Sequence, residues 1–121
     1  FRSLRDLPVF VVDNGSVPYE RDALLRICAP HKNVSIIESA ENLGFSGGNN
    51  LGILAALDRG ADWVLLLNDD TTVDEDFGAQ LRENLDNAPV GIVSLPLVES
   101  GQLVRAGRRR WPRSRGCSKT P

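Results

Sequence analysis

A run of apolar residues that ends in acidic side chains is the strongest constraint on how this 121-residue chain can fold. Residues 63–67 are all apolar, and Asn68, Asp69 and Asp70 follow them directly. The run lacks the polar alternation of a half-exposed strand and is too short for a buried helix, so it predicts a central parallel strand covered on both faces. Ligands of open α/β sheets bind at the carboxyl ends of such strands. We therefore expect the chemistry of this protein at residues 68–70.

Two interpretations of these acidic residues are open at this stage. In an extended backbone Asn68 and Asp70 point to one side and Asp69 to the other, which brings two oxygen-bearing groups together. Such oxygens suit a hard cation, Mg2+ or Mn2+, which completes its coordination with substrate phosphates. The alternative is that these acids and residues 74–76 only cap the amphipathic segment that follows, where they complement its helix dipole.

Strands and helices are expected to alternate along the chain. Besides the central run, β-branched and apolar residues predict strands at 9–12, 34–38 and 90–93, and helical spacing predicts helices at 19–29, 49–58 and 74–87. A short helical start precedes Pro8, and residues 98–106 are a candidate hairpin-like strand. This alternation predicts an α/β fold with a mostly parallel sheet, right-handed crossovers and helices on both faces.

Two further polar segments are candidates for ligand binding. Residues 13–16, Asp-Asn-Gly-Ser, end the first predicted strand. These residues favour a turn in any context. Asp13 is nevertheless a candidate for ligand binding, because it is a second carboxylate at the end of a predicted strand. Residues 42–50 form a glycine-rich loop ahead of a helix, whose unpaired N–H groups suit anions. The loop matches neither GxGxxG nor the P-loop pattern, so a flexible loop with capping asparagines is an equal alternative.

Charge is distributed unevenly along the chain. Residues 1–104 hold all 16 acidic residues and 7 of the 14 basic ones, and residues 105–121 hold the other basic residues without any acid. An acidic body argues against nucleic-acid binding. We expect one domain at 1–107 and a disordered basic tail at 108–121, with an arm for peripheral contact with an anionic membrane as the alternative.

Few residues are available for other kinds of site. His31 is the single histidine, which leaves almost no material for a histidine-based metal site or a Ser/His/Asp triad. Cys28 and Cys117 match no CxxC or zinc spacing. No apolar run reaches the roughly 18 residues of a membrane span, and no signal segment opens the sequence. We expect a cytoplasmic protein, with the inner face of the membrane as an open alternative.

Three motifs, taken in order, resemble the family-two glycosyltransferases and most closely their rhamnosyltransferase-like branch. They are Val11 to Ser16, Asn42 to Ile53 and Leu65 to Thr71. The resemblance implies a GT-A fold, which is Rossmann-like, over about residues 4–107. It also implies transfer of a sugar from a UDP- or dTDP-sugar to a hydroxyl acceptor, with inversion at the anomeric carbon. The implied acceptor is a saccharide or lipid-linked saccharide, in cell-surface polysaccharide synthesis.

The resemblance assigns roles to individual residues. The implied nucleotide-binding residues are Asp13, Asn14, Asn42, Gly44, Asn50 and Asp69. Of these, Asp13 matches the strand-end aspartate that contacts the nucleotide base. Asp70 matches the last acid of a DXD-like element, which ligates Mg2+ or Mn2+ on the diphosphate, and Asp69 matches the neighbour that reaches the ribose or the metal. As a Lewis acid such an ion neutralises the departing nucleoside diphosphate.

The sequence also departs from the family pattern. Asn49 stands where many members carry arginine. The family's first strand would lie before Phe1, and the general base that acts on the acceptor hydroxyl would lie beyond Pro121. We therefore expect an incomplete GT-A domain, and the alternative to an active transferase is a truncated fragment that binds nucleotide without turnover. A dinucleotide-binding or interaction module is disfavoured because GxGxxG is missing.

Overall fold

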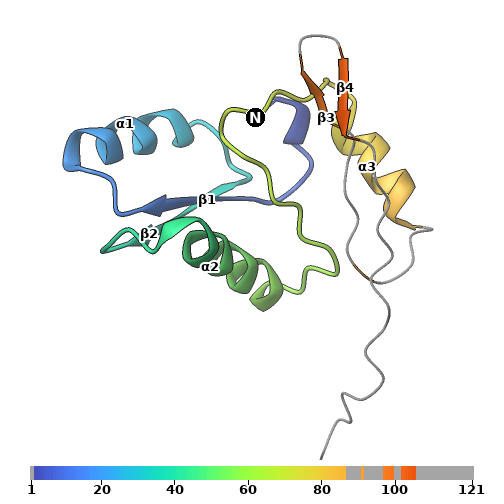
Figure 1. Cartoon of the computed structure of the whole chain (residues 1–121). Coiled ribbons are helices and arrows are strands. Elements are labelled where there is room, and N and C mark those ends of the chain that lie inside the picture. The colour runs from blue at the N-terminus through green and yellow to red at the C-terminus, as the bar shows by residue number, and fades with distance from the viewer. Residues whose placement is uncertain (1, 87–90, 92–96, 100–101, 106–121) are drawn as a thin grey trace, which may run out of the picture. The chain divides into compact units, whose positions relative to one another are not determined.

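The computed structural model describes residues 2–86, 91, 97–99 and 102–105 (Figure 1). The chain divides into two compact units, Phe1–Glu83 and Asn84–Pro121. The elements, in chain order, are η1 (a 3-10 helix, Arg2–Leu4), β1 (Val9–Asn14), α1 (Pro18–Cys28), β2 (Val34–Ser39), α2 (Gly44–Asp58), α3 (Phe77–Asp86), β3 (Leu97–Glu99) and β4 (Gln102–Arg105).

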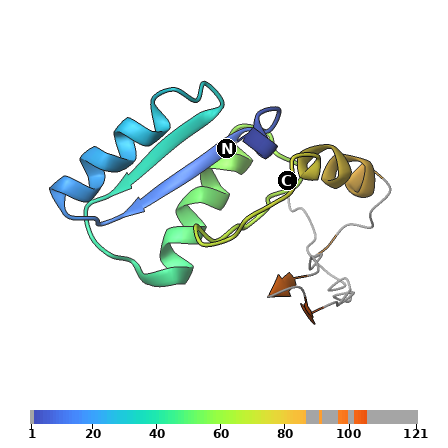
Figure 2. The ribbon, with the colours of Figure 1, turned by 90° about the horizontal axis from the view of Figure 1, so that it is seen from above.

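The centre of the first unit is the parallel pair of strands β1 and β2. Their register runs from Val9 opposite Val34 to Asn14 opposite Ser39. Because side chains alternate along a strand, odd-numbered residues of β1 point to one face and even-numbered residues to the other. Helices α1 and α2 cover these two faces (Figures 1 and 2). The predicted fold class, α/β with parallel strands and helices on both faces, is confirmed.

Helix α1 begins one residue before its predicted start. Pro18 occupies the first helical turn, where its fixed φ fits the helix and its missing N–H costs no hydrogen bond. The helix ends at Cys28, which is buried, and Pro30 follows two residues later. The N–H of Ala29 still donates to the Leu25 carbonyl, 2.9 Å away, and satisfies the last turn.

Helix α2 lies close to β1 because small residues recur along one side of it. Gly48, Gly52 and Ala56 are spaced four residues apart and therefore share a helix face. A Cβ at Gly52 would lie 3.3 Å from Val12 Cγ2, and one at Gly48 would lie 3.1 Å from Asn14 Nδ2. These contacts identify the face of β1 that α2 covers as the even-numbered one.

Arg59 fixes the end of α2 to the same face of the sheet. Its guanidinium carbon lies 4.8 Å from the centre of the Phe10 ring, and Nη1 donates to Ser35 Oγ at 2.9 Å. Phe10 and Ser35 are register partners on β1 and β2. One side chain therefore spans both strands through a cation–π contact and a hydrogen bond.

Two predicted helix starts require correction. α2 begins at Gly44 rather than Asn49, so much of the predicted glycine-rich loop forms the first turns of the helix. Gly44 has a φ of +69°, which lets the chain turn into the helix there. α3 begins at Phe77 rather than Asp74, and the N–H of Phe77 donates to the Asp74 carbonyl, so residues 74–76 form the turn before the helix.

The prediction of a central strand at residues 63–67 was wrong. These residues are irregular in the structure, and Leu65, Leu66 and Leu67 are 36%, 51% and 40% exposed. A strand needs a neighbour that accepts and donates its backbone hydrogen bonds. In this structure β1 and β2 pair with each other. Residues 63–67 join neither this pair nor the β3–β4 hairpin, so among the described residues the run has no strand partner.

In the second unit, β3 and β4 form an antiparallel hairpin in which Val98 lies opposite Leu103. This agrees with the hairpin-like strand predicted there. Residues 90, 92 and 93 of another predicted strand lie outside the described residues, as do Cys117, the boundary at 107/108 and the tail 108–121. Within the described ranges, every helix is too short or too polar to cross a membrane.

Gly15 offers a test of how tightly the turn after β1 packs. Its φ is +80°, and a Cβ there would lie 2.6 Å from both Asn42 N and Glu41 C. Gly15→Ala should lower the free energy of unfolding by more than the roughly 1–2 kcal/mol of left-handed strain alone. Gly60→Ala is the control, because Gly60 has a φ of +79° and open space around it. Urea unfolding measures both, and equal losses would contradict the close packing.

Candidate functional site

A cavity of about 370 Å³ lies where β1 and β2 end. Its lining residues come from both strand ends, the turn after β1 and helix α1: Asp13, Gly15, Ser16, Arg21, Glu38, Ser39 and Ala40. The size falls within the range of small-molecule sites, about 300–1,000 Å³. The carboxyl ends of parallel strands are also the edge at which open α/β sheets bind ligands. This edge is the best candidate for a functional site in the described part of the chain.

Asp13 is the most buried polar side chain of this cavity, at 4% exposure. Its Oδ1 accepts a hydrogen bond from the Ser16 backbone N–H at 2.9 Å. Hydrogen bonds from Ser16 lower the pKa of Asp13 below its ordinary value of 3.8, burial opposes this shift, and the nearby Arg21 charge adds to it. Asp13 is therefore ionised at neutral pH and presents a hydrogen-bond acceptor to the cavity.

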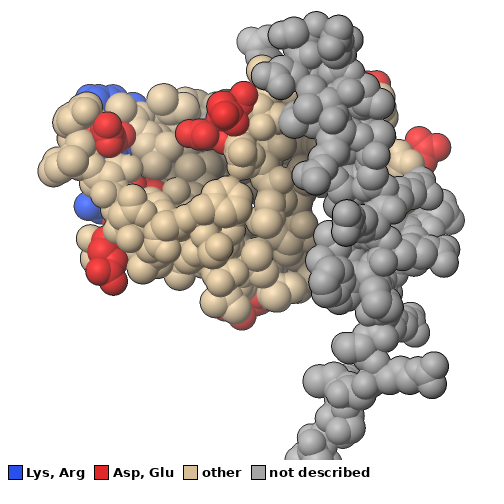
Figure 3. All heavy atoms as spheres, in the orientation of Figure 1, with Lys and Arg blue, Asp and Glu red and all other residues tan. Residues whose placement is uncertain are grey.

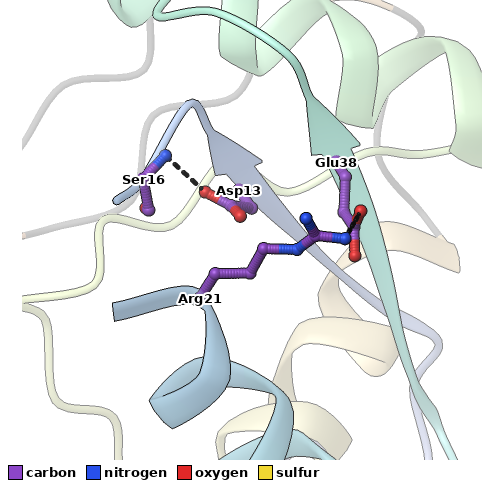
Figure 4. A network of polar contacts seen from close by, with 4 residues as sticks. All are labelled: Asp13, Ser16, Arg21 and Glu38. Atoms are coloured by element: carbon purple, nitrogen blue, oxygen red, sulfur yellow. Dashed lines mark hydrogen bonds and ion pairs between the residues drawn. The ribbon is translucent and has the colours of Figure 1, made fainter. Parts of the chain in front are cut away.

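Arg21 and Glu38 also line the cavity, and the sequence analysis did not identify them. Arg21, on α1, forms an ion pair with Glu38, on β2 (Figure 4). Glu38 is the register partner of Asp13. Glu38 could have been found, because it is another carboxylate at the end of a predicted strand. Arg21 carried no comparable signal, since a basic residue on an exposed helix face is common.

Three of the predicted site residues are joined directly to one another. Asn14 Nδ2 donates to Asn42 Oδ1 at 3.2 Å and to the Gly44 carbonyl at 3.1 Å. Asn14 Oδ1 accepts from the Leu43 N–H at 2.9 Å, and Asn42 Oδ1 accepts from the Gly44 N–H at 2.8 Å. The structure thus brings Asn14, Asn42 and Gly44 together at the start of α2. Their predicted contact with a nucleotide stays a prediction.

Asn49 and Asn50 lie on α2 itself. Asn49 Nδ2 donates to the Phe45 carbonyl at 2.8 Å, which uses its side chain within the helix. Asn50 is exposed. Neither residue lines the 370 Å³ cavity. The predicted role of Asn50 in nucleotide binding stays a prediction.

Asp69 and Asp70 are exposed and lie in a turn. The Thr71 N–H donates to the Asn68 carbonyl at 3.2 Å, so the backbone reverses here. The expectation that Asn68 and Asp70 share one side of an extended strand was therefore wrong. Neither carboxylate lines the 370 Å³ cavity.

The metal-binding capacity of these carboxylates follows from their chemistry. Among the described residues, no three histidine, cysteine or acidic side chains are grouped so that they could hold a metal ion. Mg2+ and Mn2+ need only one or two protein carboxylates when substrate phosphates complete the coordination. Two adjacent exposed carboxylates, Asp69 and Asp70, fit this requirement.

A second cavity, of about 390 Å³, lies between α1 and β2. It is lined by Leu25, Cys28, Ala29, His31, Val34 and Ile36. Burial raises the pKa of the Cys28 thiol, which keeps it protonated. A mostly apolar lining offers little to a charged ligand, so the cavity beside Asp13 is the better candidate.

The face drawn in Figure 3 agrees with the expectation for charge. Acidic side chains are more prominent than basic ones on the face drawn in Figure 3. An acidic surface repels nucleic acid and tolerates an anionic ligand only where a cation or backbone N–H groups are near. Arg21 is such a cation at the candidate site.

Comparison with known proteins identifies relatives of this sequence. The profile of the family described as "Glycosyl transferase family 2" matches residues 2–119. The low-salt glycan biosynthesis hexosyltransferase Agl10 of Haloferax volcanii is 39% identical over 67 residues, which are 54% of this chain and 20% of the relative. The galactofuranosyltransferase GlfT1 of Mycolicibacterium smegmatis is 40% identical over 62 residues, 51% of this chain and 20% of the relative.

A longer match is found with Rv1525 of Mycobacterium tuberculosis, a protein without an assigned role. It is 33% identical over 91 residues, 75% of this chain and 31% of the relative. The chain thus spans between 20% and 31% of the length of these relatives. No solved structure matches the chain significantly.

The lowered pKa of Asp13 predicts how stability depends on pH. A carboxylate whose pKa is lower in the folded state contributes stability above its unfolded pKa, and that contribution is lost as pH falls through the folded pKa. The free energy of unfolding should therefore fall below about pH 4, and less steeply in Asp13→Asn, whose side-chain oxygen can still accept from Ser16.

Urea unfolding between pH 6 and pH 2.5 measures this dependence. Asp58→Asn is the matched control, because it removes an exposed carboxylate at the end of α2. Parallel pH profiles for the parent chain and Asp13→Asn would contradict the proposed stabilisation of the ionised form.

Proposed function

This chain belongs to glycosyl transferase family 2, and we propose that its cavity at the ends of β1 and β2 binds the base of a UDP- or dTDP-sugar donor. Relatives named as a hexosyltransferase of glycan biosynthesis and a galactofuranosyltransferase support sugar transfer in general. Asp13, which is buried at the strand end and lines the cavity, carries the proposal.

Asp13 suits the base of such a donor for a chemical reason. Uracil and thymine present an imide N–H between two carbonyl groups, and an ionised carboxylate accepts from that N–H. Adenine presents no imide. A buried acceptor left unpaired costs free energy, so the site disfavours bases that lack the donor. Asn14, Asn42, Gly44 and Asn50 complete the proposed nucleotide-binding set, with Asp69 at the ribose.

Asp70, with help from Asp69, is proposed to hold a divalent cation against the donor diphosphate. Members of this family generally depend on a metal ion. Mg2+ or Mn2+ bound there supplies a Lewis acid that neutralises the departing nucleoside diphosphate. The protein's own contribution is two exposed carboxylates in a turn, which are accessible to a ligand from solvent.

The reaction we propose is transfer of the sugar to a hydroxyl of a saccharide or lipid-linked saccharide, with inversion at the anomeric carbon. It would serve cell-surface polysaccharide synthesis in the cytoplasm, at the inner face of the membrane. No residue of this chain is proposed as the general base. Donor binding without turnover is therefore the alternative, and transfer of labelled sugar from UDP-, dTDP- and GDP-sugars to a pool of hydroxyl acceptors separates the two.

The variant Asp13→Asn tests whether Asp13 selects the base of the nucleotide. The substitution keeps an oxygen for Ser16 but replaces the charged acceptor, so UDP and dTDP should bind roughly 1 to 3 kcal/mol more weakly while ADP changes little. Calorimetric titration with the three nucleotides measures this. A uniform loss for all three would show that Asp13 acts only by shaping the turn.

Asp70→Ala tests the metal role. UDP should bind the parent chain more tightly with Mn2+ than without it, and the variant should lose most of that difference, since one of two carboxylates is gone. Asp62→Ala, at another exposed acid shortly before residues 63–67, is the control. Equal UDP affinity with and without Mn2+ in the parent would refute the metal role. A variant that only melts at lower temperature would show that Asp70 acts by stabilising the turn at residues 68–71.

A further inference from the structure

Two carboxylates lie side by side at the end of the parallel pair. Asp13 and Glu38 are register partners, so they share the face that α1 covers. Neighbouring strands are about 4.8 Å apart, and like charges directly opposite each other on a sheet are destabilising. A cation between them offsets this repulsion, and α1 supplies Arg21.

The Arg21 guanidinium lies between the two acids and lines the same cavity (Figure 4). Its Nη2 donates to Glu38 Oε2, and its charge acts on Asp13. A guanidinium has five N–H donors. Within the described residues the hydrogen bond to Glu38 uses Nη2, so donors remain for a ligand in the cavity. Glu38 thereby holds a donor group in place beside Asp13.

The polar groups around Asp13 suit one class of base. The Ser16 backbone N–H donates to Asp13 Oδ1 at 2.9 Å, and the Arg21 guanidinium lies on the other side of the carboxylate (Figure 4). The cavity thus offers an acceptor, Asp13, beside the donors of Arg21. A pyrimidine imide presents the complementary pair, an N–H beside a carbonyl. That carbonyl oxygen would otherwise be left without a partner on a bound base.

We propose that Arg21 is a specificity-determining residue of the donor site, whose guanidinium donates a hydrogen bond to a carbonyl oxygen of the pyrimidine imide that Asp13 binds. This inference rests on the proposed function and adds to it a residue that recognises the base through a hydrogen bond. Glu38 is a positioning residue in this arrangement, because it orients the guanidinium and does not touch the base.

Thio-substituted nucleotides test the contact directly, because sulfur is a weaker acceptor than the carbonyl oxygen that it replaces. Calorimetry compares UDP, 2-thio-UDP and 4-thio-UDP on the full chain and on Arg21→Met. One of the two analogues should bind the parent about tenfold more weakly than UDP, and Arg21→Met should bind UDP and that analogue equally well. Only a contact between Arg21 and the substituted atom predicts this loss of discrimination.

A second variant guards against misfolding. Arg21→Met leaves two neighbouring carboxylates without a cation, whereas the double variant Arg21→Met, Glu38→Gln removes one of those charges. It should fold and should also bind UDP and the analogue equally. Arg26→Met, on the same helix and exposed, controls for the loss of a positive charge and should keep the tenfold discrimination.

Other results would overturn the proposal. If Arg21→Met and the double variant weaken UDP and both analogues by one common factor, Arg21 acts through its charge and does not read the base. If the parent binds UDP and both thio analogues equally, no carbonyl contact exists. If the parent binds no nucleoside diphosphate with or without Mn2+, the proposed function itself fails, and this result is distinguishable from the other two.

Discussion

The parallel pairing of β1 with β2 is the interaction on which the rest of the first unit depends. Its register puts Asp13 beside Glu38 on the face covered by α1, and Asn14 beside Ser39 on the face covered by α2. A shift of one residue in either strand would exchange the faces and separate these partners. The same register therefore sets both the cavity and the anchor for α2.

Adjacent residues at the end of β1 have different tasks because they point to opposite faces. Asp13 lines the cavity, whereas Asn14 bonds to the segment that opens α2. Gly15 then lets that segment approach the turn closely, because a Cβ at this position would collide with the backbone of Asn42. The polar residues after β1 therefore serve partly to hold the start of α2 against the strand. Asn14 and Asn42 already have this structural role, and binding a ligand would be a second one. Asp13 differs from them because it lines the cavity.

The carboxylates at residues 69 and 70 depend on a different part of the chain. They follow residues 63–67, whose leucines are exposed and which pair with neither β1 nor β2. In this structure neither acid lines the cavity beside Asp13. The part of Asp69 and Asp70 in the proposed donor site therefore stays a prediction.

The sequence by itself determined β1, β2, the approximate positions of the helices and the carboxylate at the end of β1. These features follow from local patterns of side chains and from turn residues, which act over a few positions. Only the tertiary structure decided that residues 63–67 are irregular, because a strand requires a partner that local sequence does not supply. It also decided that Arg21 meets Glu38, 17 positions away, and that Asn14 meets Gly44, 30 positions away. Contacts of this range depend on register and helix packing, which no local pattern specifies.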